Sequence, residues 1–272
     1  MYREHNHGCR FVNDETTRRM QFYCFNFFSL KSRHPLNTLL LHTLAWIALS
    51  FSSFVSAADT LTLDQLSQTL NSSDSNSSHA ILIRHALAPG TSDPENFKLD
   101  DCSTQRNLDD TGRAQAIQIG ELLHQAGLSE IEIFTSQWCR CRETAQLIAQ
   151  GWHTLQKAGD TNNASITDLP ALNSFFQARH RSEQQTTQLR SWLQERKTQN
   201  KTSGETAKLA ILITHQVNIT ALTQVYPSSG ELVIVRISEK DSDQSVSDPG
   251  SDYGSDHGPD HGIEVIGTIE TL

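Results

Sequence analysis

Positive charge and aromatic side chains are both scarce in this sequence of 272 residues. Lys and Arg number 22 against 31 Asp and Glu, so the formal net charge is −9. A nucleic-acid-binding domain is expected to be basic, and this balance therefore disfavours that class of protein. Aromatic residues contribute 7% and hydrophobic residues 36%, which predicts an ordinary soluble core rather than an unusual composition class.

Long apolar runs are also rare, and the exception lies near the start of the chain. Lys31 and Arg33 precede an apolar run over 39–55, and small residues follow at Ser56 to Ala58. A basic region, an apolar region and a small-residue cleavage site together predict a secretory signal peptide over 1–57, with Met20 as a plausible translation start. The alternative is an uncleaved signal-anchor, because the run approaches the minimum length of a membrane span. The predicted location is periplasmic or secreted.

Only five cysteines are present, and none has the spacing of a metal site. Cys9 and Cys24 precede the predicted cleavage site, which leaves Cys102, Cys139 and Cys141. Export would permit a disulfide from Cys102 to either of the other two, with one thiol left over. The alternative is that all three are small buried residues near a functional site.

Two short apolar runs end in conspicuous polar residues. The run that begins at His79 ends in Arg84-His85, and the run over 208–214 ends in His215. Runs of this length and composition predict buried strands of a parallel sheet. Parallel sheets carry their chemistry beyond the carboxyl ends of the strands, so we expect these side chains to lie together at one sheet edge.

Strand and helix patterns alternate through the middle of the chain. A weak amphipathic helix and a Ser/Asn-rich linker are expected over 58–78, and a single domain over 79–272. The predicted helices cover 109–126, 139–149, 184–197 and 217–225, and the predicted strands cover 79–84, 131–134, 166–169, 210–213, 231–237 and 263–270. The fold class is therefore α/β, a three-layer α/β/α sandwich with a mostly parallel sheet and an antiparallel C-terminal edge hairpin.

Residues 238–262 form a low-complexity segment with a crude Asp/His/Gly repeat. Its composition favours a solvated, disordered loop. Weak cation binding by this loop is the alternative, and calorimetric binding lost on deletion of 241–261 would support it.

The expected strand ends and helix starts bring together two histidines and two arginines. Arg84 and Arg140 are forked donors suited to phosphate oxygens, and Arg140 would lie in the first turn of a helix, where free amides favour an anion. Neutral His85 can attack phosphorus, and a protonated His215 would add positive charge at the transferring group. Such a clamp needs neither a metal ion nor another cofactor.

These motifs resemble those of the histidine phosphatase superfamily, which includes the phosphoglycerate mutases and histidine acid phosphatases. The similar segments are Leu82 to Ala86 (with Ala86 in place of the usual Gly), Asn107 to Ala116, Thr135 to Ala145 and Ile213 to His215, in family order over about 79–237. The resemblance implies that His85 accepts the phosphoryl group, which Arg84, Arg140 and His215 hold. Thr91, Arg106, Asn173 and Gln216 are further candidates for substrate binding.

Two departures from the family pattern matter. Asn173 stands where many members carry an acidic residue that protonates the leaving group, and an amide cannot do so. The acid would then come from Asp93, Glu95, Asp100 or Asp101, or be absent, which suits a good leaving group such as a phosphoramidate. Ala86 adds a methyl group beside the nucleophile and is expected to narrow the pocket.

We therefore expect an exported phosphoric monoester hydrolase that acts on a small phosphorylated substrate through phosphohistidine at His85, without metal. Its partners would include no nucleic acid, and a membrane only through an uncleaved signal-anchor. A phosphomutase is a second enzymatic possibility, which the predicted export disfavours. The alternative from another class is a catalytically weak or inactive phospho-ligand-binding protein of the same fold, which Asn173 and Ala86 suggest.

Overall fold

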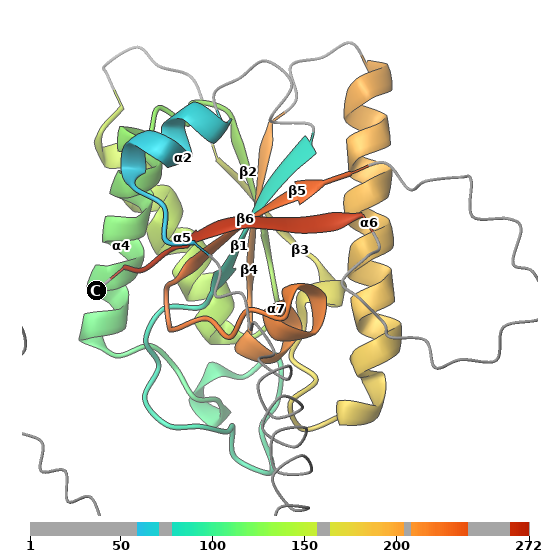
Figure 1. Ribbon diagram of the computed structural model, residues 1–272. Helices are drawn as coiled ribbons and strands as arrows, with labels where there is room; N and C mark the ends of the chain where they lie inside the picture. The colour runs from blue at the N-terminus through green and yellow to red at the C-terminus, as the bar shows by residue number, and fades with distance from the viewer. Residues whose placement is uncertain (1–58, 71–77, 157–163, 204–207, 239–261, 272) are drawn as a thin grey trace, which may run out of the picture. The chain divides into compact units, whose positions relative to one another are not determined.

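The computed structural model describes residues 59–70, 78–156, 164–203, 208–238 and 262–271 (Figure 1). The predicted signal peptide, most of the Ser/Asn-rich linker and the low-complexity segment lie outside these ranges. Among the helices that are described, none combines the length and apolar composition that a membrane span requires.

Six strands form one mixed sheet, as the sequence predicts. Their order across the sheet is β3-β2-β4-β1-β5-β6. The first four strands of that order are parallel, whereas β5 is antiparallel to both of its neighbours, β1 and β6. The strands are β1 (His79–Arg84), β2 (Ile131–Thr135), β3 (Ser165–Asp168), β4 (Leu209–Thr214), β5 (Leu232–Ile237) and β6 (Ile263–Ile269). The two C-terminal strands make the predicted antiparallel edge.

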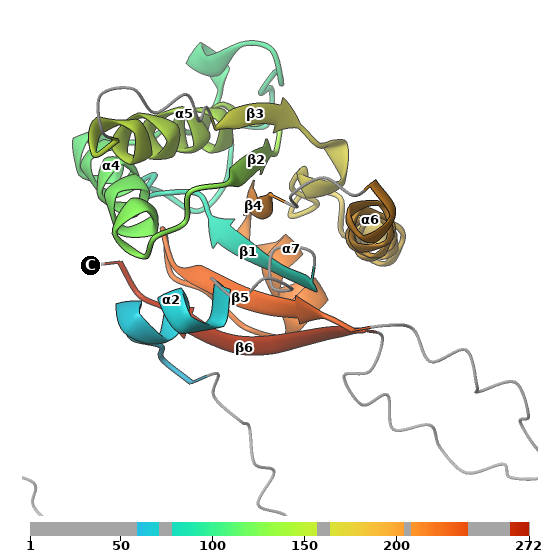
Figure 2. The ribbon, with the colours of Figure 1, turned by 90° about the horizontal axis from the view of Figure 1, so that it is seen from above.

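Helices cover both faces of the sheet (Figure 2). On one face lie α2 (Leu63–Leu70), α4 (Asp110–Gln125) and α5 (Cys139–Thr154), and on the other lie α6 (Ser182–Ser203) and α7 (Gln216–Thr223). Alternate residues of the strands supply two separate apolar cores: Ile81 and Ile83 of β1 enter one, and Ala80 and Leu82 enter the other. This period of two is what a sheet packed on both faces requires, and the three-layer architecture follows from it.

The chain fixes the position of α4 and α5 by local signals and by close packing. Asp109 caps α4 by accepting a hydrogen bond from the Gly112 amide at 2.7 Å, and Gly127 follows the helix with a left-handed φ of 77°. A Cβ atom at Gly120 would lie 2.1 Å from the Ile148 carbonyl oxygen. The two helices therefore approach backbone to backbone at a position that only glycine allows.

Two helices are longer than the sequence pattern predicts. The pattern ends α5 near Ala149, but the helix continues to Thr154, because Trp152 is buried and donates a hydrogen bond from Nε1 to the Leu128 carbonyl at 2.8 Å. The other is α6, which covers Ser182–Ser203 rather than 184–197. The connecting loops of the described ranges contain three short 3-10 helices: η1 (Cys102–Thr104), η2 (Pro170–Leu172) and η3 (Arg179–Arg181).

Candidate active site

The register between β1 and β4 places the two histidines side by side. Arg84 pairs with Thr214 at the carboxyl ends of these parallel strands, so His85 and His215 are the next residue of each. The His85 amide continues the ladder by donating to the Thr214 carbonyl at 2.9 Å. The two rings lie edge to face with their centroids 5.5 Å apart. Strand register alone thus brings together two residues that are 130 positions apart in the sequence.

The contacts of His85 hold it neutral and in a defined tautomer. Its Nδ1 lies 2.8 Å from the Ala86 carbonyl oxygen, which can only accept, so Nδ1 carries the proton and Nε2 keeps its lone pair. Burial, reinforced by the positive charges of Arg140, Arg106 and Arg84, holds the pKa of His85 well below its usual value of 6.5. The Nε2 atom is therefore available to attack an electrophile near neutral pH.

His215 differs from the sequence expectation of a protonated side chain. Arg140 donates from Nη2 to His215 Nδ1 at 3.2 Å, so Nε2 bears the proton and faces the Ser136 hydroxyl oxygen at 2.9 Å. Burial, with Arg140 beside it, holds the pKa of His215 well below 6.5. The positive charge at the site consequently comes from arginines, and His215 helps to position Arg140.

Arg140 lies in the first turn of α5, just beyond the end of β2, as predicted. No side chain of its own segment caps this helix; instead Gln105, from the loop after β1, accepts a hydrogen bond from the Cys139 amide at 3.0 Å. Arg140 is only 3% exposed and forms an ion pair with Asp93 at 2.8 Å. The start of α5 and the long loop between β1 and α4 (the first long loop) are thus joined at the Arg140 guanidinium group.

Three guanidinium groups surround His85, and each keeps an unused donor. Arg84 donates to the Pro227 carbonyl at 2.9 Å, Arg106 donates to the Ala88 carbonyl, and Arg140 has the contacts given above. The Nε atoms of all three are buried and have no hydrogen-bond partner within the described part of the chain. Buried donors are normally satisfied. Three unsatisfied cationic donors around His85 therefore indicate an anion-binding site.

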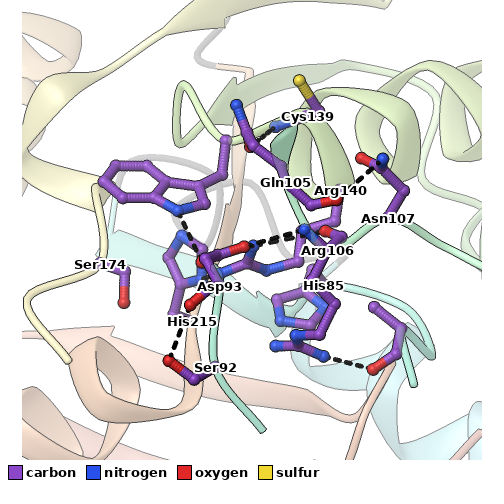
Figure 3. Close-up of polar contacts among 12 residues, drawn as sticks. His85, Ser92, Asp93, Gln105, Arg106, Asn107, Cys139, Arg140, Ser174 and His215 are labelled. Carbon is purple, nitrogen blue, oxygen red and sulfur yellow. Dashed lines mark hydrogen bonds and ion pairs between the residues drawn. The ribbon is translucent and has the colours of Figure 1, made fainter. Parts of the chain in front are cut away.

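Asp93 serves as an acceptor that organises the arginines (Figure 3). Its Oδ1 accepts from the Arg106 amide at 3.0 Å and from Arg140 Nη1 at 2.8 Å, and its Oδ2 accepts from Trp138 Nε1 at 3.1 Å. In these three contacts the carboxyl group acts as an acceptor through both of its oxygens. Asp93, one of the four expected acid candidates, therefore has both of its carboxyl oxygens engaged by donors from the protein.

A cavity of about 470 Å³ opens over His85. Of the candidates from the sequence, Arg84, His85, Thr91, Arg106, Arg140, His215 and Gln216 line it. Asp93 is the sole carboxylate among the described lining residues; Glu95, Asp100 and Asp101 do not reach the cavity. The structure thus assembles seven of the eight predicted site residues around one space.

Asn173 is the candidate that lies elsewhere. Its side-chain oxygen accepts from the Gln137 amide at 2.9 Å and from the Ser136 hydroxyl at 3.3 Å, and it is not a lining residue. Because Ser136 faces His215, Asn173 acts on the site by positioning rather than by substrate contact. Ala86 also departs from expectation: it is fully buried in the core against α4 and α5, so its methyl group does not narrow the cavity.

One disulfide joins the first long loop to α5. Cys102 bonds to Cys139, with their Cα atoms 5.6 Å apart, which is one of the two pairings that the sequence left open. Cys139 directly precedes Arg140, so the bond fastens the loop beside this residue. Of the three cysteines in the described part of the chain, Cys141 is left as a thiol; it is buried, and burial raises its pKa to about 12. That thiol is expected to be unreactive in the folded protein.

Several residues that shape the site are not marked by any pattern in the sequence. Trp138, Tyr226, Gln177 and Arg181 line the cavity, and Gln105 caps the helix that carries Arg140. A polar residue in a loop carries no periodic signal that would mark it in advance.

Because His85 and His215 are buried and neutral, the free energy of unfolding is expected to decrease as the pH is lowered. In the unfolded chain both become protonated below about pH 6.5, whereas in the folded protein both stay neutral to lower pH, so the unfolded state binds more protons in that interval. The free energy of unfolding should therefore fall as the pH drops below about 6.5, by up to about 1.4 kcal/mol per pH unit for each histidine. Urea denaturation at several pH values measures this slope. His85→Gln should reduce it, and an unchanged slope in that variant would contradict the assignment.

Comparison with known proteins places the domain in a family. Residues 80–209 match the family model described as histidine phosphatase superfamily (branch 1). The domain that contains these residues therefore belongs to the histidine phosphatase superfamily, as its motifs indicate. No curated protein matches the chain in a sequence search.

Solved structures of three phosphatases are similar to this chain at low identity. The protein histidine phosphatase SixA is 14% identical, with a TM-score of 0.40, and the match covers 58% of this chain and 88% of SixA. A mycobacterial glucosyl-3-phosphoglycerate phosphatase is 12% identical, with a TM-score of 0.41 and coverages of 58% and 90%. A phosphoserine phosphatase from Entamoeba histolytica is 14% identical, with a TM-score of 0.36 and coverages of 58% and 89%. Scores at this level do not carry the named activities over to this chain.

Proposed function

We propose that this protein is a phosphatase that hydrolyses a small phosphomonoester through a phosphohistidine at His85. The observation that carries the proposal is the state of His85: Nδ1 is committed to the Ala86 carbonyl, and Nε2 is left free beside three arginines with unused donors. A neutral histidine without arginines around it would indicate only a core histidine. Arginines with unused donors but without such a histidine would indicate only an anion-binding site. Their combination in one cavity favours phosphoryl transfer.

The first step is the attack of His85 Nε2 on phosphorus. The new N–P bond forms as the bond from phosphorus to the leaving oxygen breaks, and that oxygen departs with the bonding electron pair. The Nδ1–H bond to the Ala86 carbonyl stabilises the positive charge that the ring gains. Arg84, Arg106 and Arg140 stabilise the equatorial oxygens, where charge accumulates. A water molecule then attacks phosphorus, the N–P bond breaks, and neutral His85 and inorganic phosphate result.

Proton supply to the leaving group limits the substrates. Asp93 is the one carboxylate among the described residues that line the cavity, and it accepts three hydrogen bonds from donors. The leaving oxygen must therefore depart unprotonated or take a proton from water. We infer that phosphomonoesters with good leaving groups, such as aryl phosphates, are turned over faster than alkyl phosphates.

Trapping of the intermediate tests the mechanism. Wild-type protein quenched during turnover of a labelled aryl phosphate should carry label that is lost in acid and kept in base, as expected for phosphohistidine. The His85→Ala variant should carry none. Label that survives acid and is lost in base would place the phosphoryl group on serine or threonine and would refute the mechanism.

The proposed reaction is independent of metal, because the arginines supply the positive charge. Among the described residues, no group of three or more His, Cys, Asp or Glu side chains is arranged to hold a metal ion. Treatment with excess EDTA should leave kcat/KM for an aryl phosphate unchanged. A strong loss that added Mg²⁺ or Zn²⁺ restores would require a metal in the reaction.

We also propose that the protein is exported. The basic, apolar and small-residue pattern of the first 57 residues supports this, and so does the Cys102–Cys139 disulfide, because such bonds persist mainly in oxidising compartments. Fractionation of cells that express the full chain, with N-terminal sequencing of the product, tests both export and cleavage near Ala57 or Ala58. A full-length product in the cytoplasm would refute the proposal.

A further inference from the structure

The lining of the catalytic cavity carries more positive charge than one phosphoryl group neutralises. Among the described residues that line it are four arginines, Arg84, Arg106, Arg140 and Arg181, and one carboxylate, Asp93. The histidines add no charge because both are neutral. A phosphate monoester brings at most about two negative charges at neutral pH. One arginine is therefore left without a counter-charge when the phosphoryl group is bound.

Arg181 differs from the other three in its contacts. Arg84, Arg106 and Arg140 are each fixed by hydrogen bonds to backbone or to Asp93. The Arg181 side chain is exposed and has no hydrogen bond or ion pair within the described ranges of the chain. Its guanidinium group is therefore the one in the lining that is free to bind a further anion.

The position of Arg181 is unfavourable for the stability of the helix that follows it. Arg179, His180 and Arg181 form η3, directly before the 22-residue helix α6. A helix N-terminus carries the positive end of the dipole, where basic residues are disfavoured. Residues that are unfavourable for local structure are common at functional sites, so a role in anion binding would explain a basic residue at position 181.

The segment of the cavity lining that contains Arg181, here called the wall, leaves room for more than a phosphate group. Gln177 of the same segment donates to the Ser92 hydroxyl and to the Asp93 carbonyl, both at 3.2 Å, and so joins this wall to the first long loop. The aromatic side chains of Phe97, Trp138, Phe176 and Tyr226 also line the cavity. A volume of about 470 Å³ lies within the range of small-molecule sites, so the leaving group has room inside.

We propose that the leaving group of the substrate carries a second anionic group, a carboxylate or a phosphate, and that Arg181 binds it. This inference rests on the proposed phosphatase function, since it concerns the same cavity. Arg181 is thereby a specificity residue: it does not contact the transferring phosphoryl group, and it selects among phosphomonoesters by their far end.

Matched aryl phosphates test the inference. The probes are phenyl phosphate, para-carboxyphenyl phosphate and para-phenylene bisphosphate, which differ in charge at the far end of the ring. Wild type should prefer at least one of the two anionic probes over phenyl phosphate by about fivefold in kcat/KM, the size of one partly exposed ion pair. Arg181→Gln should lose that preference. Arg179→Gln is the matched control, because Arg179 lies over the Phe176 ring and is not a lining residue of this cavity.

The outcomes separate the inference from the proposed function. Turnover of phenyl phosphate without any preference would overturn the inference and leave the phosphatase function standing. If Arg181→Gln and Arg179→Gln lost the preference for anionic probes equally, the preference would come from the overall positive charge of the region. That result would also overturn the inference. Should wild type turn over none of the probes, the proposed function fails, and calorimetry with phenylphosphonate and para-carboxyphenylphosphonate still decides the inference. Tighter binding of the carboxylate form, lost in Arg181→Gln and kept in Arg179→Gln, supports it; equal binding refutes it.

Discussion

Replacing His85 by alanine is expected to lower kcat/KM for an aryl phosphate by about a thousandfold or more, because the variant has no nucleophile. The stability of the protein should change little by comparison. Steady-state kinetics measure the first quantity, and urea denaturation measures the second. The three arginines remain in His85→Ala, so inorganic phosphate should still bind and should still stabilise the folded protein.

The control for this experiment is His153→Ala. His153 lies in the last turn of α5, at the other end of that helix from Arg140, and it does not line the cavity. Its removal should leave kcat/KM unchanged. Turnover in His85→Ala within about tenfold of wild type would exclude His85 as the nucleophile. A wild-type protein that binds phosphate but turns over no substrate would instead establish the phospho-ligand-binding alternative.

Replacing Asp93 by asparagine is expected to lower the free energy of unfolding by about 3–5 kcal/mol. The Arg140 and Asp93 side chains are 4% and 8% exposed, so the substitution leaves a buried charge without its partner. An amide also has one acceptor oxygen where Asp93 uses two, and its NH₂ group would face other donors. Urea denaturation measures the loss. Saturating phosphate should recover part of it, since an anion among the arginines replaces the missing charge.

Asp101→Asn is the matched control for Asp93. Asp101 lies in the same loop, caps η1 through an exposed hydrogen bond to Ser103, and does not reach the cavity. Its substitution should cost little stability. The same variants also test the role of Asp93 in catalysis. If Asp93 positions Arg140, the loss of kcat/KM in Asp93→Asn should be equal across aryl phosphates of different leaving-group pKa. A loss that grows with that pKa would instead identify Asp93 as the general acid.

The main site residues follow from the sequence because strand topology fixes them. A short apolar run that ends in Arg84-His85 and another that ends in His215 need only be parallel neighbours to bring their ends together. Arg140 follows from the same logic, since it opens the helix after a third parallel strand. None of these positions depends on the detailed path of a loop. The alternation of strand and helix likewise determined the three layers and the antiparallel C-terminal edge.

Protonation states and loop positions required the tertiary structure. The charge of His215 depends on the donor that faces Nδ1, and that donor, Arg140, is 75 residues away. Asp93 and Arg106 belong to a loop whose course is fixed by the disulfide between Cys102 and Cys139 and by Gln105 on the Cys139 amide. Such contacts have no sequence period, so their partners cannot be inferred from spacing. The partners of Asn173 and Ala86 could not be inferred from spacing either; neither residue lines the cavity in the folded protein.

The sequence by itself thus determined the sheet, the edge at which the candidate residues meet, and the positions of His85, Arg84 and Arg140 at that edge, because local hydrophobic periodicity and the direction of parallel strands decide these. The tertiary structure alone decided the remaining features: that His85 and His215 are neutral, that Asp93 binds Arg140 and the Arg106 amide, and that Arg181 lines the same cavity. The physical reason is that burial, hydrogen-bond partners and charge balance are properties of neighbours in space, and loops bring those neighbours from distant parts of the chain.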